Sequence, residues 1–163
     1  LRPRGLFGIG DSSIIPRLIK ANRRSGIPLF RGGHNLVDIT CVENAAIALR
    51  LAIESEAAVG QVYNITNGEP QEFRAILEEL FRALGETPRY LRLPLGLLYG
   101  VATLSERVYR LFRLDGEPPF TRYTICTLGY SQTLNIEKAK RELGYRPIVS
   151  LRAGIRKYAK GER

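Results

Sequence analysis

The sequence predicts an α/β fold in which helices alternate with short strands. Two observations support this prediction. Apolar residues recur at three- and four-residue steps in several long segments, and short β-branched or aromatic runs bounded by turn residues lie between them. Such alternation usually builds a sheet covered by helices. Only about four strand candidates appear, which is few for a self-contained doubly wound sheet.

The boundaries of these elements follow from capping and turn residues. Ser12 or Asp11 is suited to cap the first helix, and Pro70 suits the first turn of the third. Gly85 and Gly144 are suited to end two of the helices. We expect helices over residues 12–25, 42–55, 70–84, 96–113, 136–143 and 150–160. We expect strands over residues 1–3, 36–40, 61–66 and 89–94.

The composition limits the classes of partner. The chain has 163 residues, 44% of them hydrophobic, and a formal net charge of +9. This charge favours nucleic acid or an anionic membrane surface. Arginines scattered without a run of five like charges are equally typical of solvated helix faces. No apolar run approaches the roughly 20 residues that cross a bilayer.

The cysteines and the single histidine do not indicate a metal site. Cys41 and Cys126 lie far apart and lack metal-ligand spacing, so we expect buried thiols, with a disulfide left open. His34 has no neighbouring cysteine or carboxylate cluster and is expected in an exposed loop. The sequence therefore predicts no bound metal.

The opening segment, LRPRGLFGIGDSS, is rich in glycine but does not match a phosphate-binding loop. Its glycines are spaced G-x-x-G-x-G rather than G-x-G-x-x-G, and the lysine and hydroxyl of a P-loop are missing. We interpret residues 1–3 as the end of a buried parallel strand. The glycines then form the loop at its carboxyl end, where open α/β sheets bind ligands.

Four segments in order resemble a known family. LRPRGLFGIGD, NLVDITCVENAAIALRLAIES, GQVYNITNGEP and NIEKAKRELGYRPIVSLRAGI are similar to the extended short-chain dehydrogenases/reductases, the NAD-dependent epimerase/dehydratase group. The segment RLPLGLLYGVATLSERVYRLFRLDGEPPFTRY resembles the branch of 3β-hydroxysteroid dehydrogenases. The resemblance implies the C-terminal part of a Rossmann-like doubly wound sheet over residues 1–70. It also implies a small, mostly helical substrate-binding region over residues 71–163.

The family's reactive groups are not found in this sequence. No tyrosine is followed four residues later by lysine, and no glycine-rich dinucleotide loop is present. The resemblance therefore implies that the chain is the substrate-binding half of a longer oxidoreductase or epimerase, with no catalytic residue of its own. The cofactor would be NAD or NADP. The substrate would be a secondary alcohol or ketone, apolar and sterol-, terpenoid- or β-keto-acid-like.

The sequence also leads to expectations about partners and location. The missing N-terminal half of the same protein and further copies of the chain are the expected partners, without nucleic acid. The expected location is the cytoplasm, with peripheral membrane contact through Arg107, Arg110 and Arg113 as a further option.

Binding roles are implied for residues near the opening segment. The resemblance assigns cofactor contacts to Pro3, Gly5 and Leu6. It assigns substrate contacts to Phe7, Gly8, Asp11, Ile14, Asn35 and Asp38.

Each of these roles has a structural alternative. Pro3 can simply end a strand, and Phe7 can belong to the core. Asp38 and Asn44 can serve as cap or turn residues, because Asp and Asn suit both purposes.

The long helix over residues 97–112 and the loop around Pro118, Pro119 and Phe120 would cover an apolar substrate. The alternative is an apolar stripe that faces the core, and Tyr130 can also pack in the core. A different class of function stays open as well, a non-enzymatic basic module that binds anionic membrane or nucleic acid.

Overall fold

The computed structural model describes residues 1–92, 95–112 and 129–161, and it confirms the α/β fold. Cys126, Arg113 and the loop at Pro118–Phe120 lie outside the described residues. The helices are α1 (Ile14–Arg24), α2 (Val42–Glu54), α3 (Phe73–Leu84), α4 (Leu95–Leu111), α6 (Glu137–Leu143) and α7 (Leu151–Gly161). The strands are β1 (Arg2–Pro3), β2 (Leu6–Phe7), β3 (Ile27–Leu29), β4 (Leu36–Val37), β5 (Thr40–Cys41), β6 (Asn64–Ile65), β7 (Gln71–Glu72) and β8 (Tyr90–Arg92). Two 3₁₀ turns, η1 (Arg31–Gly33) and η2 (Glu56–Ala58), complete the described elements.

The described strands form four two-stranded ladders. β1 pairs with β6, β2 with β5 and β3 with β8, all in parallel, and β4 pairs antiparallel with β7. The parallel direction predicted for residues 1–3 is confirmed, with Arg2 opposite Asn64 and Pro3 opposite Ile65. The predicted burial is wrong, because Arg2 and Pro3 are both exposed. β1 has a strand partner on one side only within the described chain, so its other edge lies open.

The strand predicted over residues 36–40 is divided into β4 and β5. Between them, the Asp38 N–H donates to the carbonyl of Gln132 at 3.3 Å, and the Asp38 carboxylate accepts from the Leu134 N–H at 2.8 Å. The chain therefore leaves its pairing with β7 before it joins β2. The strand predicted over residues 61–66 is reduced to β6, and β2, β3 and β7 were not predicted.

The predicted glycine helix ends are confirmed, whereas the predicted start of the third helix is wrong. Gly85 and Gly144 follow α3 and α6 in the left-handed region, with φ values of 76° and 64°. Pro70 lies outside α3, which begins at Phe73 after the short strand β7. β7 pairs with β4, and this pairing delays the helix.

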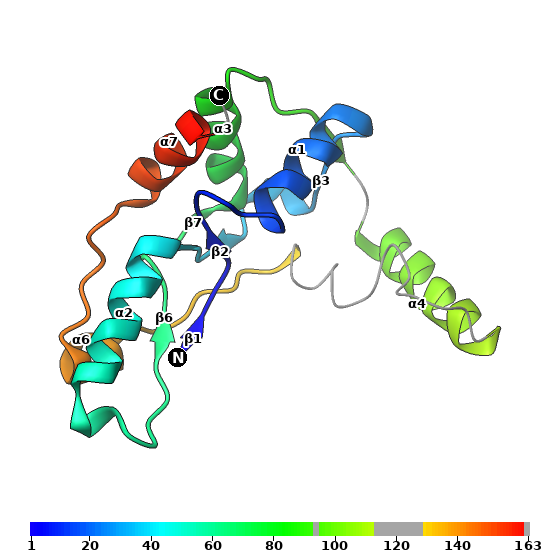
Figure 1. Ribbon diagram of the computed structural model, residues 1–163. Helices are drawn as coiled ribbons and strands as arrows, with labels where there is room; N and C mark the ends of the chain where they lie inside the picture. Colours follow the sequence, from blue (N-terminus) through cyan, green and yellow to red (C-terminus); the bar gives the residue numbers. More distant parts are fainter. Residues whose placement is uncertain (93–94, 113–128, 162–163) are drawn as a thin grey trace.

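The buried side chains form two clusters. The first contains the apolar stripe of α3 together with side chains of α7, β3 and Phe7. Figure 1 shows α3 and α7 side by side. The second lies between α2, β6 and α6, where Ala48 is fully buried against Tyr63 and Tyr145. The small alanine side chains of α2 thus permit close packing in this cluster.

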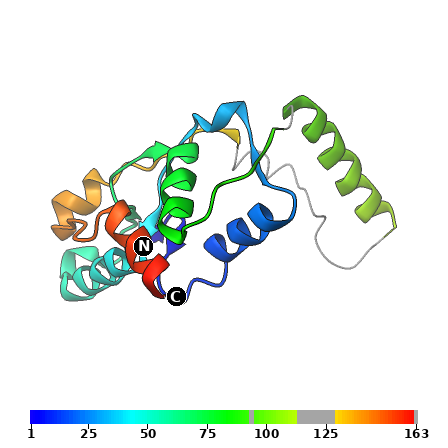
Figure 2. The same ribbon diagram turned by 90° about the horizontal axis from the view of Figure 1, so that it is seen from above.

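Helix α4 stands apart from the rest of the described chain in both ribbon views (Figures 1 and 2). Leu104 is 64% exposed and Leu111 78% exposed, and Val101 and Val108 are also exposed. The interpretation that this stripe faces the core is therefore wrong among the described residues. No described helix is long and apolar enough to span a membrane.

The start of α1 is capped by Asp11, one of the two predicted candidates. Its carboxylate accepts from the backbone N–H groups of Ser13 at 2.7 Å, Ile14 at 3.1 Å and Ile15 at 2.9 Å. These groups have no partner within a helix, and the negative charge also suits the helix N-terminus.

Replacing Asp11 with alanine is expected to lower the free energy of unfolding by about 1 to 2 kcal/mol, because three N–H groups lose their acceptor. Urea unfolding followed by circular dichroism measures this change. Asp11→Asn is the matched control, since its side-chain oxygen can still accept, and we expect it to lose less than half as much. Equal losses in the two variants would contradict the capping role.

Candidate functional site

The site predicted from the sequence lies where the opening segment crosses the β4–β5 connection. Gly5 joins β1 to β2 with a φ of 54°, and a Cβ there would meet Ile39 Cγ2 at 3.1 Å. A Cβ on Gly8 would overlap Cγ1 of Val42, the first residue of α2. Both glycines therefore let the opening segment approach the second segment closely, as glycines do where two backbones meet.

Buried polar atoms without a partner occur at this crossing and just before β4. Within the described chain they include Nε of Arg4, both amide atoms of Asn35 and Oδ1 of Asp38. Asn35 is only 7% exposed and Asp38 only 3%. Buried polar atoms are normally hydrogen-bonded, so several unpaired atoms in one region indicate a place for a ligand or ordered water.

Gln132 connects two of these residues across the site. Its side-chain oxygen accepts from Nη2 of Arg4, and its backbone carbonyl accepts from the Asp38 N–H at 3.3 Å. Its own N–H donates to the carbonyl of Leu36 at 2.7 Å. The segment around Gln132 therefore closes one side of the site, although it lies far away in the sequence.

The structure brings Asn35 and Asp38 into two neighbouring pockets. Asp38 lines a pocket of about 350 Å³ with Gly68, Pro70 and residues 133–137 and 140. Asn35 lines one of about 330 Å³ with Arg31, His34, Gly129, Tyr130 and Ser131. Tyr130 is exposed, so its interpretation as a core residue is wrong. His34 lies exposed as predicted, 3.1 Å from a carboxylate oxygen of Glu72.

The other predicted residues have mixed environments. Pro3 and Leu6 are exposed at the ends of β1 and β2, and Ile14 is exposed at the start of α1. Phe7 is buried in the first cluster, the alternative that the sequence left open. The carboxylate of Asp11 is engaged in capping α1. The cofactor and substrate roles of all these residues stay predictions.

Asn44 belongs to a buried network beside the site. Its amide donates to Oδ1 of Asn67 and to the carbonyl of Val149, both at 2.8 Å. Its oxygen accepts from the N–H groups of Ile148 and Val149 at 2.9 and 3.0 Å. All of its bonding capacity holds the chain together, so Asn44 has a structural role.

Two buried groups have shifted pKa values and are unsuited to acid–base chemistry near neutral pH. Burial raises the pKa of the Cys41 thiol to about 11, although a hydrogen bond from Asn67 opposes the shift. Burial also raises the pKa of Tyr145 to about 12. No group of three or more His, Cys, Asp or Glu residues suited to a metal occurs in the described ranges.

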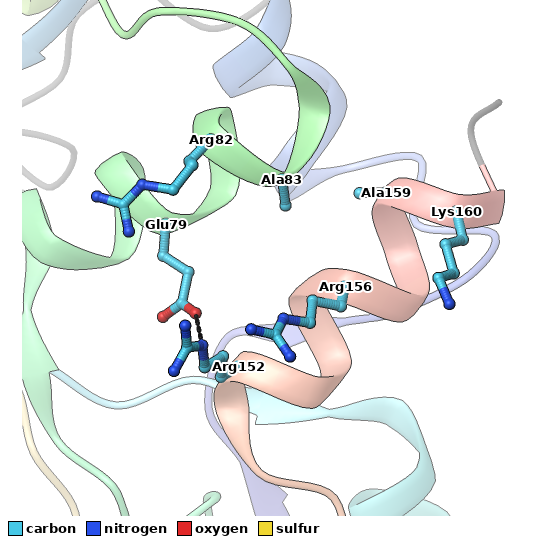
Figure 3. A pocket seen from close by; sticks show the side chains of 7 residues that line it. All are labelled: Glu79, Arg82, Ala83, Arg152, Arg156, Ala159 and Lys160. Atoms are coloured by element: carbon cyan, nitrogen blue, oxygen red, sulfur yellow. Dashed lines mark ion pairs between the residues drawn. The ribbon is translucent and has the colours of Figure 1, made fainter.

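A further pocket of about 310 Å³ lies between α3 and α7, and none of the predicted site residues is among those that line it (Figure 3). Glu79 of α3 pairs with Arg152 of α7 at 3.0 Å across it. The small side chains of Ala83 and Ala159 leave the space open. The remaining lining residues are Arg82, Arg156 and Lys160.

Comparisons with known proteins find similar sequences over almost the whole of this chain. The chain is 37% identical over 161 residues to the 2-alkyl-3-oxoalkanoate reductase of Stenotrophomonas maltophilia, covering 96% of this chain and 49% of that protein. It is 36% identical over 167 residues to the decarboxylating sterol-4-alpha-carboxylate 3-dehydrogenase of Schizosaccharomyces pombe, with 96% and 48% covered. The chain thus spans about half the length of these relatives.

Solved structures have the same fold. The crystal structure of gox2253 matches with a TM-score of 0.65 at 24% identity, covering 96% of this chain and 46% of that one. The UDP-glucuronic acid 4-epimerase of Bacillus cereus, solved with NAD, matches with a TM-score of 0.61 at 20% identity, with 96% and 40% covered. A model of one family matches residues 1–95, which include the opening segment, Asn35 and Asp38. The chain belongs to the 3-beta hydroxysteroid dehydrogenase/isomerase family.

Proposed function

We propose that this chain forms the substrate-side wall of an NAD(P)-dependent oxidoreductase that interconverts a secondary alcohol and a ketone. The observation that carries the proposal is the group of unpaired buried atoms in Arg4, Asn35 and Asp38. Arg4 directly follows parallel strand β1 at its carboxyl end, and Gln132 links Arg4 to Asp38. Open α/β sheets bind their ligands at that end of their strands.

The described residues fit one end of a nicotinamide cofactor. Pro3 and Leu6 are exposed at consecutive strand ends. A planar ring can therefore reach the chain there. When bound, NAD(P) accepts or supplies the hydride. Pro3, Gly5 and Leu6 would bind and orient the ring, and Asn35 and Asp38 would orient the substrate.

The substrate is best described as an apolar β-hydroxy or β-oxo carboxylic acid. The names of two relatives, 2-alkyl-3-oxoalkanoate reductase and sterol-4-alpha-carboxylate 3-dehydrogenase, both describe a carboxylate on the carbon next to C3. This common feature supports the same class for the present site. The apolar part would lie against the apolar side chains that line the site.

The test uses the protein as its gene encodes it. A long-chain 2-alkyl-3-hydroxy acid is supplied with NAD+ or NADP+, and the absorbance of reduced nicotinamide is followed. Oxidation removes the C3 hydrogen as hydride and the hydroxyl hydrogen as a proton, and it leaves the 3-oxo acid. We expect saturable turnover with one of the two cofactors. No turnover of either the acid or its methyl ester with either cofactor would refute the proposal.

The second candidate function, a basic binding module, is favoured by one observation, the α3–α7 pocket. Within the described ranges, Arg82, Arg156 and Lys160 line it without an acidic partner. This candidate predicts saturable binding to anionic vesicles or an oligonucleotide that falls steeply with salt. Titrations at two ionic strengths, repeated with Arg82→Gln/Arg156→Gln, separate the two functions. The oxidoreductase proposal expects no saturable binding in any of them.

A further inference from the structure

We propose that Arg4 recognises the carboxylate of the substrate, and that Gln132 holds the Arg4 guanidinium in position. This inference rests on the proposed function and assigns its specificity to one side chain. Neither residue was identified from the sequence. The structure reveals them because both lie at the crossing that contains Asn35 and Asp38.

The backbone of Arg4 is fixed from two sides. Its N–H donates to the carbonyl of Ile65 at 3.2 Å, and its carbonyl accepts from Oγ1 of Thr40 at 2.6 Å. Arg4 directly follows Pro3 at the end of β1 and precedes the turn at Gly5. A binding side chain that starts from a fixed strand end is positioned more precisely than one on a free loop.

Within the part of the chain that the structure describes, the Arg4 side chain has no counter-ion. It is partly buried, its Nε is buried without a partner, and its Nη2 bonds only a neutral amide oxygen. No Asp or Glu within the described ranges forms an ion pair with it. By contrast, Arg23 pairs with Glu86 and Arg74 with Glu78.

A partly buried guanidinium without an anion is unfavourable, and a bound carboxylate would correct this. The planar fork of N–H donors on arginine also matches the two oxygens of a carboxylate. A substrate acid therefore supplies the missing charge and the missing acceptor together.

The amide of Gln132 matters because it is neutral. Its oxygen orients the guanidinium through Nη2 without cancelling the positive charge. A glutamate at the same position would have nearly the same shape and would neutralise Arg4 from within the protein. Gln132→Glu should therefore remove the attraction for a substrate carboxylate while keeping the geometry, and Gln132 is a positioning residue.

The test compares a 2-alkyl-3-hydroxy acid with its methyl ester, using the protein as its gene encodes it. The wild type should have a lower KM for the acid than for the ester. Arg4→Gln and Gln132→Glu should each raise the KM of the acid roughly 30-fold. The first variant removes the positive charge that would pair with the substrate carboxylate, and the second neutralises it. The KM of the ester should stay within about threefold, since the ester carries no charge. Arg17→Gln, on the exposed side of α1, is the matched control and should change neither value.

The outcomes separate this inference from the proposed function. Turnover of the ester with an unchanged acid KM in both variants would overturn the role of Arg4 and leave the oxidoreductase intact. Equal losses for acid and ester would show a purely structural role and would also overturn it. A wild type with no preference for the acid refutes the inference without any variant. If neither compound is oxidised, both proposals fail.

Discussion

Replacing Asn44 with alanine is expected to lower the free energy of unfolding by about 3 to 5 kcal/mol. The substitution leaves the N–H groups of Ile148 and Val149 without their acceptor, and Val149 is buried. It also removes a donor to Oδ1 of Asn67 and opens a small cavity. Each buried polar group left unpaired costs about 1 to 3 kcal/mol. Together these losses are a large fraction of the free energy of unfolding of a typical protein.

The measurement is urea unfolding, with Asn64→Ala as the matched control. The Asn64 amide makes a single long bond of 3.4 Å to the carbonyl of Asn135, so its loss should cost less than about 1 kcal/mol. Asn44→Asp gives a further check. It keeps the acceptor but places a carboxylate oxygen against the Val149 carbonyl and Oδ1 of Asn67. Burial raises the pKa of such a carboxyl, so this variant should become more stable as the pH falls. Similar losses in Asn44→Ala and Asn64→Ala would contradict the role of the network.

The helices could be predicted from the sequence because their signals are local. The apolar stripe of α3 and the glycines that end α3 and α6 are readable within a few residues of each element. The short strands β2, β3 and β7 could not be predicted in this way. Each consists of two or three residues and is defined by a partner far along the chain, as Ile27 is by Tyr90. The exposed stripe of α4 has the same periodicity as a buried one, so periodicity alone could not place it.

The candidate site was predicted only in part, because some of its residues are brought together by contacts between distant parts of the sequence. Asn35 and Asp38 belong to a segment that resembles a known family, and the structure gives both residues unpaired buried atoms. Arg4 lies inside the quoted opening segment, but nothing in the sequence distinguishes its guanidinium from the other arginines. Its partner Gln132 is 128 positions away and carries no motif. Only the folded chain brings these two side chains together.

Gly154 links the fold to the site, and Gly154→Ala is expected to lower the free energy of unfolding by about 2 kcal/mol. A Cβ at this position would overlap Sγ of Cys41 and would lie 3.1 Å from Cζ of Phe7. Alanine improves helix propensity by about 1 kcal/mol, but overpacking a tight core costs about 1 to 3 kcal/mol or more. Since the neighbouring atoms belong to β5 and β2, which both pair within the core, we expect the steric cost to prevail.

A double-mutant cycle with Cys41→Ala tests this cause directly. The smaller side chain removes the sulfur that the new methyl group would overlap. The double variant should therefore lose less free energy of unfolding than the two single variants lose together, by about 1 kcal/mol or more. Gly161→Ala in the same helix is the control, because its Cβ would meet Ile9 at an ordinary 3.4 Å. Phe7 ends β2 inside the opening segment, so we expect pressure from α7 in this variant to shift the chain between Arg4 and Asp11 as well. Gly154→Ala should therefore raise KM for the hydroxy acid and for its ester alike, in contrast to Arg4→Gln, and an effect on the acid alone would contradict this connection.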